Sequence, residues 1–235
     1  MKKLLVVTGG TKGIGRAIID LFALNGFDIA TCSRKEEDLN NLKSAIQAVH
    51  PQIEVHTKQA DLSVKEEVKA FAEFVNNLKR PVEVLVNNAG FFVPGTIHEE
   101  KEGSLEAMIE GNLYSAYYMT RGLIGWMKTR KSGHIFNICS VASIKPYENG
   151  GSYSISKYAL LGMTKNLREE MKAFGVRVTA VIPGATYTAS WEGVDLPEER
   201  FMKSTDVAEA IYGTYTMSPN TVVEEIVLRP QLGDI

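Results

Sequence analysis

Tyr153 and Lys157 are the residue pair of this sequence best suited to acid–base chemistry. They lie in "GGSYSISKYALLG" (150–162), where two glycines precede a polar stretch and an apolar run. On a helix, residues four apart share a face. A free tyrosine has a pKa of about 10, and a nearby ammonium favours the phenolate. The pair therefore suits a proton donor to a carbonyl oxygen, although the same spacing is common on a solvated helix face.

A serine stands ahead of this pair, directly after an apolar segment. Ser140 follows "HIFNIC" (134–139), and its hydroxyl would hydrogen-bond the same carbonyl oxygen and stabilise the charge that develops there. A strand-end hydroxyl bonded only within the protein is the alternative. A serine hydrolase is disfavoured because "ICSVA" lacks the G-x-S-x-G elbow.

A glycine-rich turn near the start of the chain predicts an anion site. In "TGGTKGIGRAI" (8–18), Gly9, Gly13 and Gly15 separate an apolar strand from a helix. Glycines let the backbone approach a ligand closely, and the helix N-terminus beyond them favours a phosphate. The spacing is G-x-x-x-G-x-G rather than the common G-x-G-x-x-G, and such a turn can also serve only to reverse the chain.

The end of the second apolar segment indicates which dinucleotide would bind. Ser33 stands where a carboxylate would accept hydrogen bonds from a ribose 2′-hydroxyl, and Arg34 follows it. A guanidinium pairs well with a 2′-phosphate, and Lys12 would add a second positive charge. These residues predict NADP(H) rather than NAD(H), unless Arg34 and its neighbours are simply solvated.

The elements that must position these residues are visible as apolar runs and helical periods. Near-continuous apolar strands that alternate with amphipathic helices predict a parallel sheet covered on both faces. With 44% hydrophobic residues in 235, we expect one domain, residues 1–235, with a Rossmann-like doubly wound α/β fold. The seven expected strands are 3–8, 28–33, 53–58, 82–87, 134–139, 176–182 and 222–228.

Composition argues against several classes of function. A formal net charge of −2 gives no basic field for nucleic acid, and no run approaches the ~18 apolar residues of a membrane span. The apolar run of "MKKLLVVTGG" is too short for a signal peptide. Cys32 and Cys139 are expected to be buried free thiols in a reducing cytoplasm. The four histidines are expected on the surface or in loops, with no metal site.

Taken together, these motifs resemble the short-chain dehydrogenase/reductase family. They occur in the family's order and spacing over essentially the whole chain: "TGGTKGIG" (8–15), "DL" (61–62), "NNAG" (87–90), Asn112, Ser140, "YSISK" (153–157) and "PGATYT" (183–188).

The resemblance implies roles for residues along the whole chain. Asn112 would support a water-linked proton relay, and Lys157 would also contact the nicotinamide ribose. Asp61 would bond the adenine amino group, although it also suits a cap before the next helix. The positions implied to contact the cofactor are Thr8, Gly9, Lys12, Gly13, Ile14, Gly15, Ser33, Arg34, Asp61, Leu62, Asn88, Ala89, Gly90, Tyr153, Lys157, Pro183, Gly184, Thr186 and Thr188.

The substrate is less clearly indicated. Aromatic and apolar residues flank the reactive segments and suit either a pocket for a hydrophobic carbonyl compound or ordinary core packing: Phe91, Phe92, Val93, Tyr147, Tyr187 and Trp191. The C-terminal "VVEEIVLRPQLGDI" looks like that of bacterial sepiapterin-reductase-like members, which favours sepiapterin or a diketone. A 3-oxoacyl-[acyl-carrier-protein] reductase is the alternative, with Lys128, Arg130 and Lys131 as a weak docking patch. A non-catalytic NADP(H) sensor is a minor third reading.

Two further segments suggest a subunit interface and a lid. The segment 104–128 is expected to form a helix that is apolar around much of its circumference. The resemblance implies that this helix and the helix of Tyr153 pack across subunits in a homodimer or homotetramer. The segment 189–203 has mixed charge and no clean period, and its length suits a lid.

Overall fold

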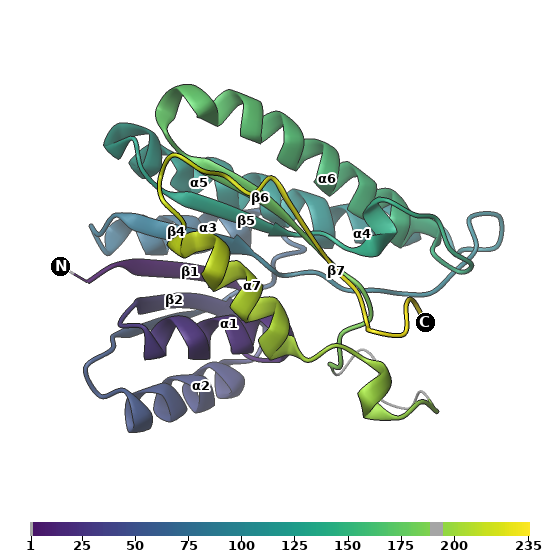
Figure 1. Ribbon diagram of the computed structural model, residues 1–235, viewed down its shortest axis with the longest axis horizontal. Helices are drawn as coiled ribbons and strands as arrows, with labels where there is room; N and C mark the ends of the chain where they lie inside the picture. The colour runs from purple at the N-terminus through teal and green to yellow at the C-terminus, as the bar shows by residue number, and fades with distance from the viewer. Residues whose placement is uncertain (1, 189–194) are drawn as a thin grey trace.

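The computed structural model describes residues 2–188 and 195–235, which form a seven-stranded parallel sheet between two layers of helices (Figure 1). The strand order is β3-β2-β1-β4-β5-β6-β7, and every pairing is parallel. The doubly wound fold expected from the sequence is confirmed. The strands are β1 Leu4–Thr8, β2 Asp28–Ser33, β3 Val55–Gln59, β4 Val82–Asn87, β5 His134–Ile138, β6 Arg177–Pro183 and β7 Glu225–Leu228.

Helices cover both faces of this sheet. The α-helices are α1 Gly13–Leu24, α2 Glu36–Val49, α3 Lys65–Asn77, α4 Ser104–Ile109, α5 Ser115–Arg130, α6 Gly151–Met171 and α7 Ser204–Thr216. Packing of α1 against α7 forms part of one layer, and α3, α5 and α6 lie together in the other (Figure 1). Short helical turns η1 Glu110–Tyr114, η2 Val141–Ser143, η3 Lys172–Phe174 and η5 Glu198–Arg200 lie in the connections between them.

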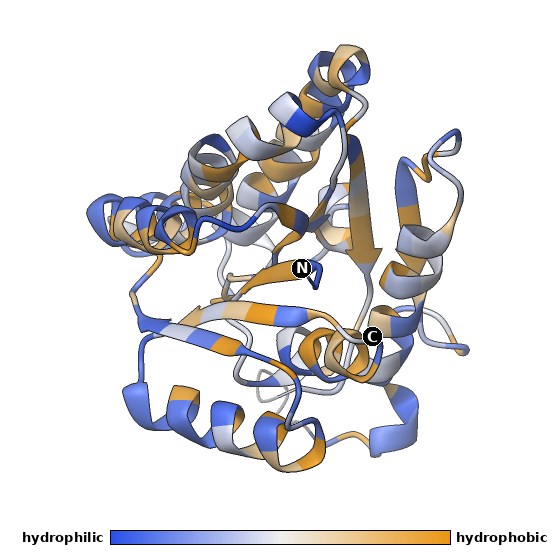
Figure 2. Cartoon of the chain, turned by 90° about the vertical axis from the view of Figure 1, so that its left-hand side faces the viewer, coloured by the Kyte–Doolittle hydropathy of each residue, from blue (hydrophilic) through white to orange (hydrophobic). Residues whose placement is uncertain are grey.

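The apolar strands supply two cores, one on each face of the sheet. In β1, Leu5 and Val7 pack with α1 and α7, whereas Leu4 and Val6 pack with α3 and α5. Both sets are fully buried because successive side chains of a strand point to opposite faces. Figure 2 shows the central strands largely hydrophobic and the flanking helices alternating between hydrophilic and hydrophobic residues. This double burial explains the continuous apolar runs in the sequence.

The sheet order fixes where a ligand would bind. Strand β1 has β2 on one side and β4 on the other, so the chain changes winding direction between β1 and β4. In open α/β sheets, ligands bind beyond the carboxyl ends of the strands at this switch point. The glycine turn follows β1, Asn88 follows β4 and Ser140 follows β5. The candidate residues therefore lie together at the carboxyl ends of the central strands.

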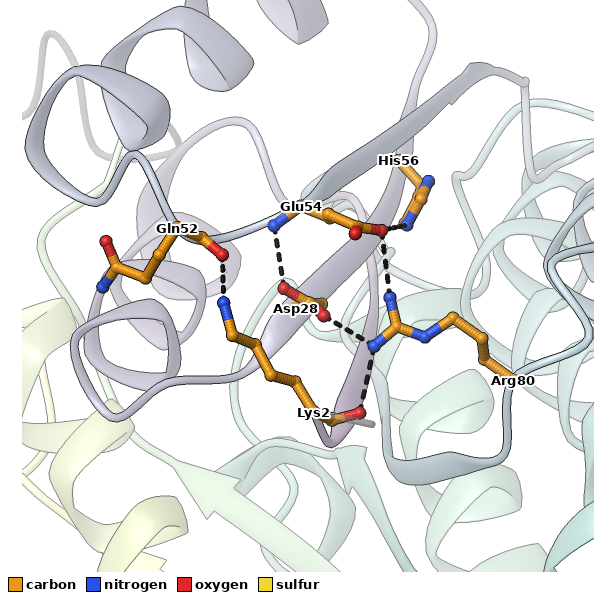
Figure 3. Close-up of polar contacts among 6 residues, drawn as sticks. All are labelled: Lys2, Asp28, Gln52, Glu54, His56 and Arg80. Atoms are coloured by element: carbon orange, nitrogen blue, oxygen red, sulfur yellow. Dashed lines mark hydrogen bonds and ion pairs between the residues drawn. The ribbon is translucent and has the colours of Figure 1, made fainter.

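An ionic cluster lies at the opposite end of the sheet, where strands β1 to β4 begin (Figure 3). Arg80 Nη2 lies 2.5 Å from Asp28 Oδ2 and 3.0 Å from the carbonyl oxygen of Lys2. Arg80 Nη1 lies 3.2 Å from Glu54 Oε2, and Glu54 N donates to Asp28 Oδ1 at 2.8 Å. The cluster joins the chain start, β2, the segment leading into β3 and the α3–β4 connection.

The expectation that all four histidines are surface or loop residues is wrong for His134. This side chain is fully buried in β5, where Nε2 lies 2.8 Å from Thr179 Oγ1 and the ring stacks on Phe136. Burial lowers its pKa well below the usual range, and the Arg177 charge adds to this effect. Cys32 and Cys139 are buried free thiols, as expected, and burial raises the pKa of Cys32 to about 12.

Two structural features are absent from the described part of the chain. None of its helices is long and apolar enough to cross a membrane. No group of three or more potential metal-ligating His, Cys, Asp or Glu side chains occurs within residues 2–188 and 195–235.

Candidate active site

Tyr153 and Lys157 lie in the first two turns of α6, and the lysine is not a solvated side chain. Lys157 is only 5% exposed, and its Nζ donates a 2.8 Å hydrogen bond to the carbonyl oxygen of Ile138 at the end of β5. The same Nζ lies 5.7 Å from the centroid of the Tyr153 ring. A buried ammonium needs partners, and here they are a strand-end carbonyl and the face of a tyrosine. The solvated-helix alternative is therefore wrong.

Ser140 stands two residues beyond the carbonyl that holds Lys157. It caps the short helix η2: its Oγ accepts from Ala142 N at 3.1 Å, and its N donates to Ser143 Oγ at 3.2 Å. The cap fixes the position of the hydroxyl oxygen while its own hydrogen remains a donor. The structure shows the local cap, and the bonding of this hydroxyl to a substrate oxygen stays a prediction.

Asn112 lies inside the protein rather than on a helix surface. It is 1% exposed and sits in the π-helical turn η1, which interrupts the helix expected over 104–128. Asn112 Oδ1 accepts from Phe91 N at 2.8 Å, and Nδ2 donates to Phe91 O at 3.1 Å. Single π turns inside helices are frequent at functional sites.

Ser156 contributes to this arrangement, although sequence reasoning gave it no role. Its Oγ accepts from Asn112 Nδ2 at 3.0 Å and donates to Tyr153 O at 2.7 Å. The hydroxyl therefore connects Asn112 to the turn of α6 that carries Tyr153. The signal available in the sequence was its spacing, because Ser156 lies three residues after Tyr153 on the same helix.

The glycine turn is tied to the end of β4. Thr8 Oγ1 accepts from the backbone N of both Asn88 and Ala89 at 2.9 Å. Asn88 Nδ2 donates to Thr8 O at 2.9 Å and to Gly9 O at 3.1 Å. A Cβ on Gly15 would lie 2.5 Å from Asn88 Nδ2, so this close approach requires glycine.

The N-terminus of α1 is suited to an anion. Lys12, at the N-cap position, makes no side-chain hydrogen bond to the first turn. The N–H groups of a first helical turn lack intrahelical partners and attract negative charge. Gly13, at the start of this helix, has φ +55°, which favours glycine there. These residues fit the pyrophosphate of a dinucleotide.

The residues expected at the adenosine end lie at the carboxyl ends of β2 and β3. Ser33 Oγ lies 3.4 Å from Thr11 Oγ1 of the glycine turn, and Arg34 is exposed. Lys12 Nζ lies 3.4 Å from Asp38 Oδ2 in α2, so its charge is shared with a carboxylate. Lys12 and Arg34 are the two cations expected to meet a 2′-phosphate. Lys12 lies in the glycine turn and Arg34 at the end of β2, and these two segments are in contact.

Asp61 is held by a local turn. Its Oδ1 accepts from Ser63 N at 3.0 Å and from Ser63 Oγ at 2.8 Å, before α3 begins at Lys65. Partial burial raises the pKa of this carboxyl, but the Ser63 hydrogen bonds and the Arg34 charge outweigh burial and lower it overall. A carboxylate bonded through one oxygen retains the other for an adenine amino group. Leu62, beside it, is buried.

The segment "PGATYT" crosses from β6 towards the glycine turn. Gly184 N donates to Leu228 O at 2.8 Å, and Thr186 Oγ1 donates to Gly184 O at 3.1 Å. A Cβ on Gly13 would lie 3.0 Å from Thr188 Cγ2, so Thr188 stands directly opposite the turn. The cofactor residues expected at the two ends of the sequence are therefore neighbours in space.

The candidate substrate residues do not form one group. Phe92 packs edge-on to Tyr153 with ring centroids 4.9 Å apart, and Tyr147 lies 6.4 Å from Phe92. Phe91 instead packs against Gly111, and Tyr187 lies 5.7 Å from Phe201. Burial, with a smaller effect of Tyr153, raises the pKa of Tyr147. Trp191 lies outside the described residues.

The structure is a doubly wound α/β fold with a glycine turn after β1 and with Ser140, Tyr153 and Lys157 near the carboxyl end of β5, and comparison with known proteins identifies its family. The family model described as short chain dehydrogenase matches residues 3–198. The chain belongs to this family.

Several relatives are similar over their full length. The sepiapterin reductase of Chlorobaculum tepidum is 33% identical over 243 residues, which cover 100% of this chain and 99% of that protein. An alcohol dehydrogenase from Thermococcus sibiricus, complexed with 5-hydroxy-NADP, has a TM-score of 0.92 at 26% identity and covers 100% of this chain and 99% of its own. The L-sorbose reductase from Gluconobacter frateurii, complexed with NADPH and L-sorbose, has a TM-score of 0.90 at 25% identity, covering 97% and 95%.

Proposed function

We propose that the protein is an NADP(H)-dependent oxidoreductase that interconverts a small carbonyl compound and its alcohol. The observation that carries this proposal is the buried Lys157 ammonium, held between Ile138 O and the face of Tyr153 beside the end of β5. A cation beside a phenol favours the phenolate, and the proposed proton transfer requires this charge stabilisation.

The chain's own residues then have defined roles in carbonyl reduction. NADPH, when bound, would supply the hydride for the carbonyl carbon. Tyr153 donates its phenolic proton to the carbonyl oxygen, Ser140 hydrogen-bonds that oxygen, and Lys157 stabilises the phenolate that remains. Asn112, through Phe91 and Ser156, fixes the elements around Tyr153. In the reverse direction, the phenolate accepts the proton of the alcohol.

NADP(H) is the cofactor in this proposal. The glycine turn and the unpartnered N–H groups at the start of α1 suit the pyrophosphate. Arg34 and Lys12 at the adenosine corner suit a 2′-phosphate, and no carboxylate stands at Ser33. The solved relatives complexed with 5-hydroxy-NADP and NADPH support the same cofactor.

A small carbonyl substrate is favoured over an acyl-carrier-protein thioester. The basic segment that would dock a carrier protein ends α5, which leads into the amino end of β5 and so lies away from Tyr153. There Arg130 Nη2 lies 3.2 Å from Glu83 Oε2, and Lys128 Nζ lies 4.3 Å from the Phe174 ring centroid. The Phe92–Tyr147 cluster and the similarity to a sepiapterin reductase favour sepiapterin or a diketone. No observation favours a non-catalytic sensor.

A screen of NADPH oxidation with sepiapterin, diketones, aldehydes and acetoacetyl thioesters tests this proposal, with Tyr153→Phe as the diagnostic variant. We expect activity on the small carbonyls and its near-complete loss in Tyr153→Phe, with NADPH binding retained. Tyr212→Phe, on α7 in the opposite helix layer, is the matched control. Normal turnover by Tyr153→Phe would refute the mechanism.

The protein is proposed to be a homo-oligomer of the cytoplasm. Exposed aromatic side chains Tyr114, Tyr117 and Trp126 on η1 and α5, with Tyr158 on α6, suit a homodimer or homotetramer interface. Light scattering that shows only monomer at working concentration would contradict this assembly. Two buried free thiols suit a reducing compartment, so we place the protein in the cytoplasm.

A further inference from the structure

The connection between β4 and α4 is fastened to the candidate active site at two points. Near its start, the backbone of Phe91 is held by both polar atoms of the Asn112 amide. Near its end, Glu100 reaches the start of α6: Oε1 accepts from Ser152 N at 2.9 Å, and Oε2 accepts from the Ser152 hydroxyl. Between these points, Phe92 packs edge-on against the Tyr153 ring at 4.9 Å.

The start of α6 is shaped to admit this carboxylate. Gly151 has φ +29°, and a Cβ there would lie 2.1 Å from Glu100 Oε1 and 2.5 Å from Gly95 O. Gly95 N in turn donates to Asn149 O at 3.0 Å. Only glycine at position 151 lets the two segments approach this closely. Ser152, the residue that receives the carboxylate, is 2% exposed.

Glu100 also supplies a negative charge and a hydrogen-bond acceptor at the start of α6, which the residues of this helix do not provide. The helix has no acidic residue in its first turn, and Gly150 at its N-cap position provides no side chain to cap it. First-turn N–H groups need an acceptor, and the positive end of the helix dipole favours negative charge. A carboxylate contributed from 52 positions earlier in the chain meets both needs.

We propose that Glu100 is a positioning residue for Tyr153. It holds the first turn of α6 against the β4–α4 connection, and so it fixes the tyrosine backbone and seats Phe92 on the phenol ring. This inference rests on the proposed role of Tyr153 as proton donor. The glycine turn and Asn88, which would hold the pyrophosphate side of the cofactor, are bonded to each other and not to Glu100. Lys157, the α6 residue implied to contact the nicotinamide ribose, is held separately by Ile138 O. Loss of Glu100 should therefore slow turnover and spare cofactor binding.

Steady-state kinetics on purified variants test this separation. We expect Glu100→Ala to lower kcat at least tenfold while the KM for NADPH stays within twofold. Glu100→Gln retains an acceptor for Ser152 N and should recover much of the lost kcat. The matched control is Glu99→Ala, because that neighbouring side chain is largely exposed. An unchanged kcat in Glu100→Ala, or an equal loss of NADPH affinity, would overturn the inference.

A second measurement does not depend on turnover. Hydrogen exchange of backbone amides in residues 149–158 should be faster in Glu100→Ala than in the wild type. Gly151→Ala, which displaces the carboxylate, should give the same exchange and the same kinetic change. Gly162→Ala on the same helix faces open space and should give neither.

The kinetic and exchange measurements together distinguish failure of the proposed function from failure of the inference about Glu100. If the wild type turns over no carbonyl compound with NADPH, the proposed function fails, and exchange alone decides whether Glu100 holds α6. If the wild type turns over and exchange at 149–158 is unchanged in both Glu100→Ala and Gly151→Ala, the inference about Glu100 fails by itself.

Discussion

Asn112 donates a 3.0 Å hydrogen bond to Ser156, and this bond connects the π-helical turn η1 to the helix that carries Tyr153. Both side chains are buried, so neither can exchange its partner for bulk water at low cost. The pair thus couples the position of the β4–α4 connection, through Asn112, to the position of the proposed acid.

The first prediction is that Ser156→Ala lowers kcat several-fold while the KM for NADPH changes little. The substitution removes one acceptor of Asn112 Nδ2 and a donor to Tyr153 O, and an unmet buried polar group costs about 1–3 kcal/mol. Ser154→Ala is the matched control, because Ser154 Oγ is buried without a hydrogen-bond partner among the described residues. Equal kcat values for the two variants would show that the Asn112–Ser156 bond does not support turnover.

The second prediction concerns stability at the opposite edge of the sheet. Asp28 and Arg80 have side chains only 3% and 13% exposed, so Asp28→Asn leaves a buried guanidinium without its main counter-charge. We expect a loss of about 3–5 kcal/mol in the free energy of unfolding, measured by urea denaturation. Asp20→Asn removes an exposed ion pair with Arg16 and should cost less than about 1 kcal/mol. Similar losses in both variants would contradict the role of the Asp28–Arg80 pair.

The sheet and the positions of the candidate site residues on it were predictable from the sequence because their signals are local. Each strand is a short apolar run, and Tyr153, Lys157 and Ser140 stand at helical or strand-end spacings. Strand limits were less accurate where pairing sets them. The last strand was expected over 222–228 but covers Glu225–Leu228, because Val222 and Val223 are apolar without extending the ladder to β6.

The features that could not be predicted depend on contacts between distant segments. The residues 104–128 have helical character throughout, so nothing local marks the π turn that directs Asn112 inward. Glu100 lies in a connection, and its role becomes visible only when α6 stands beside it. His134 was misjudged for a different reason. It lies within a strand that was expected to be apolar, and the imidazole was judged by its polarity rather than by its neighbours.

The third prediction is a loss of stability at mildly acidic pH. Burial lowers the pKa of both His134 and His56 in the folded state, whereas an unfolded histidine titrates at about 6.5. Below that pH, the unfolded chain binds protons that the folded protein excludes. The free energy of unfolding therefore falls as pH drops below about 6.5, by up to about 1.4 kcal/mol per pH unit for the buried His134 and by less for the partly exposed His56.

Urea denaturation between pH 7.5 and 5 measures this dependence, and His134→Gln should make it shallower. His98→Gln changes a largely exposed histidine and should leave the slope as in the wild type. A wild-type slope that His134→Gln does not alter would mean that other groups cause the acid sensitivity.

The fourth prediction concerns cofactor choice. Arg34 is exposed at the end of β2, beside the glycine turn that carries Lys12, and it is proposed to meet the 2′-phosphate. Hydrogen bonds to charged groups contribute about 1.5–3 kcal/mol, so Arg34→Ser should raise the KM for NADPH by about 10–100-fold. The KM for NADH should stay within about twofold, since NADH carries no 2′-phosphate for the guanidinium to meet.

Lys35→Ser is the matched control, because Lys35 is the adjacent exposed cation and precedes α2 without a side-chain cap. Parallel KM measurements with both cofactors separate a specific contact from a general change in surface charge. A general effect would raise the KM for NADPH equally in Arg34→Ser and Lys35→Ser, and a wild-type preference for NADH would refute the assignment outright. A selective loss in Arg34→Ser would instead place the 2′-phosphate at the corner between β2 and the glycine turn.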